Sequence, residues 1–133
     1  MTMSHRIISG FTILVPRYAD GLAFFRDKLG FTVLEDIAQS NGKRWLVVAP
    51  GKQAGQARII LAVPTNEAQL GAMGNQSGGR VGFFLQTDDF DRDYEDFVAK
   101  GVKFTEDPRQ EPHGKVAVFE DDFGNLWDLI QPK

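Results

Sequence analysis

The sequence predicts an α+β fold in which one chain holds two β-α-β-β-β modules. Three observations lead to this fold class. The order of expected strands and helices in the first half recurs in the second, packing positions repeat about 72 residues apart, and each long helix is expected to end at a glycine, Gly30 or Gly101. A chain of 133 residues suits a single domain. We divide this domain, residues 1–133, into module 1 at about 5–63, a connector at 64–79 and module 2 at about 80–132.

Module 1 opens with alternating apolar residues and continues with a helical stripe. Phe11, Ile13 and Val15 share one face of a strand, which ends at Pro16 because proline lacks the N–H that a strand ladder needs. The Asn41-Gly42 pair between two apolar runs is a strong hairpin signal, since both residues tolerate positive φ. The expected elements are a strand at 7–15, a helix at 19–28, and strands at 31–38, 43–49 and 58–63.

A connector rich in small and polar residues follows, with a short helical turn expected near residues 66–70. Module 2 then repeats the pattern of module 1. Asp88 and Asp89 are placed to cap its helix, because their side-chain oxygens can accept from unpaired N–H groups. The expected elements are a strand at 81–87, a helix at 89–100, a strand at 102–105, a polar loop at 107–114, and strands at 115–119 and 126–130.

Packing positions recur along with the order of the elements. At an offset of 72, Gly10 matches Gly82 and Phe25 matches Phe97, whereas the helix-ending glycines fit an offset of 71. The second helix is therefore expected to be one residue shorter than the first. We interpret the two modules as an internal repeat.

Composition excludes several classes of function. A net charge of −3 with mixed signs argues against a nucleic-acid partner. No apolar run approaches a membrane span, the N-terminus lacks a signal-peptide core, and the absence of cysteine removes thiolate ligands and nucleophiles. We therefore expect a soluble, cytoplasmic protein with no membrane partner. Eleven Phe and two Trp supply an aromatic interior or pocket.

Three segments resemble motifs of one family. The segment 22–31 resembles its first helix end, 87–90 resembles the start of its second helix, and 120–129 resembles its last turn and strand. This family is the vicinal-oxygen-chelate superfamily, which includes glyoxalase I, the bleomycin-resistance proteins and the extradiol dioxygenases. The resemblance implies that the two modules form a cupped, barrel-like mixed sheet with helices outside. It also implies a homodimer that completes the cavities.

Relatives that contain a metal place His and Glu ligands on the cavity faces of four strands. Carried over to this sequence, these positions fall on Gly10, Gly82, Ile60 and Asp128. Three of the four side chains have no donor atom, and one carboxylate does not hold a divalent ion. We therefore expect no metal and no cofactor, although a divalent metal is what the resemblance alone would imply.

Strand alternation gives the residues that should line the cavity. The two glycines could leave space for an organic ligand, or they could ease close packing of strands. Asp128 could be a cavity acid, a partner for Arg58 or a rim residue in water. The ligand-binding candidates are Asp128, Arg58, Gln86, Phe84, Gly10, Gly82, Ile60 and His113.

Several of these candidates have a second interpretation. Arg58 could clamp an anionic group or be an exposed arginine, and His113 could be an acid or base or a surface residue without a role. Phe84 is interpreted as core or dimer contact ahead of a stacking platform, and Gln86 either bonds a ligand or meets solvent. The acidic turn at 120–122 is expected to be solvated, since it lacks the ligand spacing of a calcium loop.

The resemblance and the missing metal ligands together predict a binding protein of the bleomycin-resistance kind. Its metal-free cavity would hold a small organic molecule. The alternative is an enzyme, either a metal-dependent glyoxalase-like lyase or isomerase or a dioxygenase. A structural or regulatory dimer without a ligand is a third possibility. No catalytic residue is assigned, and the identity of the ligand stays open.

Overall fold

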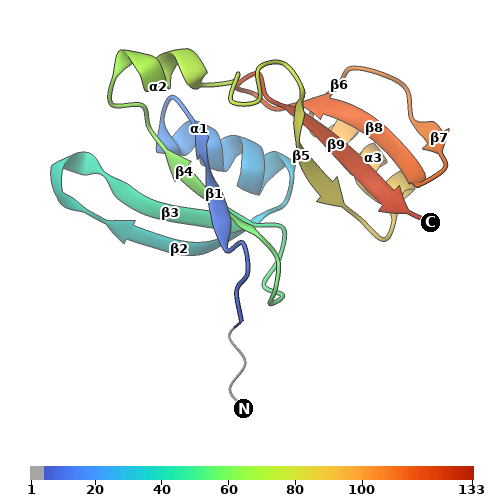
Figure 1. Cartoon of the computed structure of the whole chain (residues 1–133), viewed down its shortest axis with the longest axis horizontal. Coiled ribbons are helices and arrows are strands. Elements are labelled where there is room, and N and C mark those ends of the chain that lie inside the picture. The colour runs from blue at the N-terminus through green and yellow to red at the C-terminus, as the bar shows by residue number, and fades with distance from the viewer. Residues whose placement is uncertain (1–4) are drawn as a thin grey trace. The chain divides into compact units, whose positions relative to one another are not determined.

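The computed structural model describes residues 5–133, so the first four residues of the predicted domain lie outside it. Contacts within the chain divide it after Val63 into two units, which we describe separately. Each unit is a mixed sheet with a helix packed on one face (Figure 1). The predicted α+β class is confirmed, and the sheets are cupped but are not closed into a barrel.

The first unit has the strand order β1-β4-β3-β2, in which β1 and β4 are parallel and the other neighbours are antiparallel. The predicted hairpin is confirmed, since Asn41 and Gly42 both have positive φ between β2 and β3. The elements are β1 (Gly10–Leu14), α1 (Tyr18–Leu22) continued by η1 (Ala23–Lys28), β2 (Thr32–Ala38), η2 (Ser40–Gly42), β3 (Arg44–Ala49) and β4 (Arg58–Ala62).

The second unit has the matching order β5-β9-β8-β6, and its parallel pair is β5 with β9. Sheet topology thus repeats as the sequence predicts. The connector holds the expected short helix, whose first turn is capped by the side chain of Asn66. The elements are α2 (Glu67–Ala72), β5 (Val81–Gln86), α3 (Phe90–Ala99), β6 (Lys103–Phe104), β7 (Arg109–Glu111), β8 (Gly114–Glu120) and β9 (Leu126–Pro132).

The prediction of a polar loop at 107–114 is wrong in part, because residues 109–111 form the strand β7. This strand lies beside β8 (Figure 1), with Arg109 opposite Val116 and Glu111 opposite Gly114. It lies outside the main strand order and is largely exposed, so it has no apolar alternation by which the sequence could reveal it.

The one-residue difference between the two helices has a structural cause. The first helix widens into π-helical geometry over η1, where the Leu29 N–H donates to the Phe24 carbonyl five residues earlier. At the helix ends, Phe31 donates to Phe25 across six residues, whereas Val102 donates to Phe97 across five. The extra residue therefore sits in the π segment of the first helix. Both helices end at a glycine of positive φ, as predicted.

An aromatic layer joins α3 to the second sheet. Phe119 on β8 lies in the middle of it, stacked on Trp127 at a ring distance of 5.8 Å and edge-on to Phe97 of α3 at 6.0 Å. Phe83 of β5 contacts the other side of Trp127 at 5.0 Å. Because side chains alternate along a strand, the residues next to Phe119 and Trp127 in the sequence point to the opposite face of the sheet, which is the cupped face.

The turn between β8 and β9 is organised by a buried carboxylate, and the prediction of a fully solvated acidic turn is wrong for Asp121. One oxygen of Asp121, which is only 4% exposed, accepts hydrogen bonds from the backbone N–H groups of Phe123, Gly124 and Asn125 at 2.9–3.0 Å. The other oxygen accepts from the Asn125 amide at 2.9 Å and the Trp127 indole at 3.1 Å. Burial of this carboxylate is therefore compensated by five donors.

We predict that Asp121→Ala lowers the free energy of unfolding by about 3 kcal/mol or more, because it leaves buried donors without an acceptor. Asp121→Asn should lower the free energy of unfolding by less, since its amide oxygen can still accept hydrogen bonds from the three backbone N–H groups. The same change at the exposed neighbour, Asp122→Ala, serves as the control. Urea unfolding of the three variants measures how much stability each one loses. Equal losses of stability in Asp121→Ala and Asp122→Ala would contradict the prediction.

Candidate functional site

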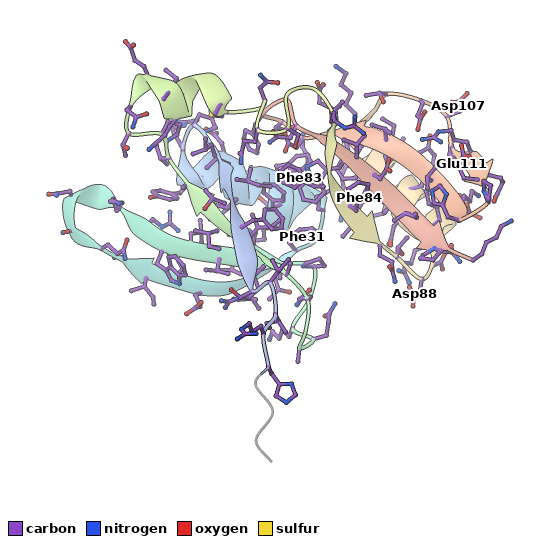
Figure 2. All side chains as sticks on the ribbon, viewed as in Figure 1. Phe31, Phe83, Phe84, Asp88, Asp107 and Glu111 are labelled. Atoms are coloured by element: carbon purple, nitrogen blue, oxygen red, sulfur yellow. The ribbon has the colours of Figure 1, made fainter. Side chains whose placement is uncertain are left out.

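The cupped face of the second sheet carries a carboxylate beside an exposed aromatic ring. Asp128 lies opposite Phe84 of β5 and Val118 of β8 in the strand pairing. Its neighbours Trp127 and Leu129 are buried on the α3 side, so Asp128 faces the cup. Phe84 projects from β5 (Figure 2). It is 66% exposed, which is unusual for so large an apolar side chain.

Asp128 is half-buried and incompletely hydrogen-bonded. Its Oδ1 atom is shielded from solvent and has no hydrogen-bond partner among the residues that the structure describes. Burial raises the pKa of this carboxyl above its usual range, and the negative charge of Glu106 raises it further. The positive charges of Arg109 and His113 act in the opposite direction and lower the pKa. A buried polar atom without a partner is rare in proteins and calls for an explanation.

The groups around Asp128 come from β7 and the segments that flank it. Arg109 donates to Glu106 at 2.9 Å and to Glu111, so its charge is largely engaged. His113 is exposed in the turn between β7 and β8, close enough to affect the pKa of Asp128. Of the predicted candidates, the structure therefore places Phe84, Gln86, Asp128 and His113 around one side of the second sheet. The influence of Arg109 and Glu106 was missed, because it depends on the unpredicted strand β7.

A polar pocket of about 120 Å³ adjoins the same face of the sheet. Leu126, which lines it, lies two residues before Asp128 on β9 and pairs with Glu120 of β8. The glycine-rich end of the connector supplies much of the remaining wall. The full lining is Gly74, Asn75, Ser77, Gly79, Arg80, Glu120, Gly124, Asn125 and Leu126. Because this volume is below the range for drug-sized ligands, a ligand of that size would also have to cover the open sheet face.

The first sheet carries a separate polar cluster. Glu35 of β2 accepts hydrogen bonds through one oxygen from the Trp45 indole and from the Arg58 guanidinium, each at 3.2 Å. Arg58 thus has a carboxylate partner within its own unit, and Ile60 is half-buried two residues further along the same strand. Pairing of Arg58 with Asp128, one of the interpretations that the sequence left open, stays untested.

Glu35 was missed because of a bulge in β2. The register shifts between Val33 and Glu35, so Val33 lies opposite Val48 while Glu35 lies opposite Val47. Simple alternation would place Val33 and Glu35 on one face, and the bulge moves Glu35 to the other. A bulge of this kind has no signal in the pattern of apolar residues.

The two glycines at the expected ligand positions do not leave open space. A Cβ atom at Gly10 would lie 2.6 Å from the carbonyl oxygen of Arg58, and one at Gly82 would collide with the hydroxyl of Ser77. Gly82 also sits at a register shift in β5. The structure thus favours close packing over room for a ligand as the reason for both glycines.

The residues at the four carried-over positions do not fit a divalent metal. Gly10, Gly82 and Ile60 offer no side-chain donor, and Asp128 offers a single carboxylate. Within residues 5–133, no group of three or more His, Cys, Asp or Glu side chains is arranged to hold a metal ion. That this protein works without a metal is still a prediction.

The sequence matches the family model of the Glyoxalase/Bleomycin resistance protein/Dioxygenase superfamily over residues 7–129. The chain belongs to this superfamily. An uncharacterized protein of Shewanella frigidimarina (strain NCIMB 400) is 44% identical over 120 residues, which cover 90% of this chain and 88% of the relative. Membership confirms the resemblance that the three motifs predicted.

Solved structures agree with this chain in fold. UcmS2 is 30% identical, with a TM-score of 0.79 and coverage of 96% of this chain and 98% of that one. TnmS3, described as an antibiotic binding protein from Streptomyces sp. CB03234, is also 30% identical, with a TM-score of 0.74 and coverage of 100% and 99%. Across the described residues, none of the helices has the length and apolar character that a membrane span requires.

We predict that Gly82→Ala destabilises the fold by about 1–3 kcal/mol, because the new methyl group collides with Ser77. Removing the obstacle in the double variant Gly82→Ala/Ser77→Gly should recover most of this loss. Gly10→Ala should be costlier, since its obstacle is backbone that cannot rotate away. Thermal unfolding of all three compares them. A Gly82→Ala protein as stable as wild type would show that the position has room after all.

Proposed function

We propose that this protein binds a small, largely aromatic organic molecule on the cupped face of its second sheet, without the help of a metal. The observation that carries the proposal is the pairing of an exposed Phe84 with the half-buried Asp128 on adjacent strands. An apolar surface with a few convergent polar groups is the usual composition of a small-molecule site.

The aromatic layout of the unit supports this reading. Phe83 and Trp127 are packed into the layer beneath the sheet, whereas Phe84 presents its ring to the cup. Leaving a phenylalanine two-thirds exposed forfeits roughly 1–2 kcal/mol of burial, which a bound ligand can recover by covering the ring. The polar pocket beside Leu126 gives such a ligand a second contact area.

The relatives support the class of ligand. TnmS3, whose fold and length match this chain throughout, is described as an antibiotic binding protein. The donor set at the carried-over metal positions supports binding without a metal, because it is reduced to one carboxylate. A homodimer and a cytoplasmic location are further expectations from the sequence, and light scattering of the purified protein tests the former.

We predict that a thermal-shift screen of aromatic antibiotics, including bleomycin, and of smaller aromatic compounds finds ligands that raise the melting temperature. A ligand at a hundred times its Kd adds about 2.7 kcal/mol of stability, or roughly 10 °C for a chain of this size. Affinity should be unchanged by EDTA, because no metal takes part. Stabilisation that disappears in EDTA would favour the metal-dependent alternative.

Replacing the exposed ring localises the site. Phe84→Ala should weaken binding about tenfold, since it removes an apolar contact without opening the core. Val98→Ala is the matched control, because Val98 is 50% exposed on α3, on the other side of the sheet. If both variants lost affinity equally, or if neither variant lost affinity, the ligand would have to bind elsewhere.

A further inference from the structure

We propose that the Oδ1 atom of Asp128 is the acceptor for a hydrogen-bond donor of the ligand, so that the site selects aromatic molecules bearing an N–H or O–H group. This inference rests on the proposed function and specifies which ligands the site takes. It is carried by the geometry of one atom, a shielded carboxylate oxygen that no described residue satisfies.

The position of Asp128 explains why the protein leaves this oxygen without a partner. Directly opposite it on the neighbouring strands stand Phe84 and Val118, neither of which has a side-chain donor. On its own strand, the next residues of the same face are Leu126 and Ile130, which are also apolar. These four side chains therefore offer Asp128 no donor, and a molecule bound on this face can supply one.

The nearby cations do not replace that donor. Arg109 is held by Glu106 and Glu111, and His113 is exposed in its turn. These groups act on Asp128 through their charges, with Arg109 and His113 favouring the ionised carboxylate and Glu106 opposing it. On the same face of β8, Glu120 stands opposite Leu126 and forms an ion pair with Lys103 of β6 at 2.8 Å, whereas the residues directly opposite Asp128 are uncharged. The acceptor thus has no donor among the described residues. Because Oδ1 is shielded, a ligand reaches it by displacing the side chains that cover it, and a hydrogen bond to a charged oxygen then contributes strongly to affinity.

Comparison of two matched probes tests this selectivity. 2-Naphthol carries an O–H donor, whereas 2-methoxynaphthalene has the same ring system without one. Wild-type protein should bind 2-naphthol about tenfold more tightly, as expected for one hydrogen bond to a charged acceptor. Asp128→Leu, which is similar in size but has no polar atom, should abolish the preference. The control Asp107→Leu, an exposed loop position, should preserve it.

The outcomes separate the two proposals. If both probes bind wild type equally well, or if Asp128→Leu keeps the preference, the anchoring role of Asp128 is wrong while the ligand-binding face stands. If neither probe binds, the proposed function itself fails for small aromatics. Fluorescence titration of the naphthalene ring measures both affinities.

A stability measurement checks the state of Asp128 without any ligand. Because its pKa is raised in the folded chain, the folded state holds this proton to a higher pH than the unfolded state, and stability falls as pH rises through that window. Asp128→Asn cannot ionise, so its melting temperature relative to wild type should increase as the pH rises above the ordinary pKa of an aspartate, 3.8. If Asp128 instead stabilised the fold through bonds of its ionised form, the difference would run the opposite way.

Discussion

The second sheet depends on the hydrogen bonds that Asp121 accepts in the turn between β8 and β9. Five donors from the turn and from β9 converge on this one carboxylate, which is almost fully buried. They fix where β9 begins, and β9 lies between β5 and β8 in the sheet. The register of β9 against β8 follows from that starting point. The position of Asp128 on β9 therefore depends on the turn.

Two carboxylates, Asp121 in the turn and Asp128 on β9, differ in how completely they are hydrogen-bonded. Asp121 is buried and fully satisfied, which makes it a structural residue. Asp128 is half-buried with one oxygen that no described residue satisfies, and burial raises its pKa. In the first sheet, Glu35 resembles Asp121 in having internal donors, Trp45 and Arg58. Proteins tolerate an unsatisfied carboxylate where function uses it, at the expense of stability.

Periodicity and turn residues predicted the fold well. The repeated positions, the glycines that end the helices and the Asn-Gly hairpin all follow from local geometry, and the structure has them. Features that depend on pairing between strands were not predictable. The strand β7 has no apolar alternation, the bulge in β2 reverses the side of Glu35, and the donors of Asp121 meet only once the turn has closed. Asp128 was a ligand-binding candidate from the sequence, and the structure adds that its Oδ1 atom has no hydrogen-bond partner among the described residues.

The central claim is that a ligand completes the hydrogen bonding of Asp128 on the face that Phe84 leaves open. A crystal structure of the protein with 2-naphthol tests it most directly. We predict that the naphthol oxygen lies about 2.5–3.0 Å from Asp128 Oδ1, with the ring against Phe84. A naphthol ring bound away from this face, or an Asp128 oxygen that still has no partner in the complex, would contradict the claim.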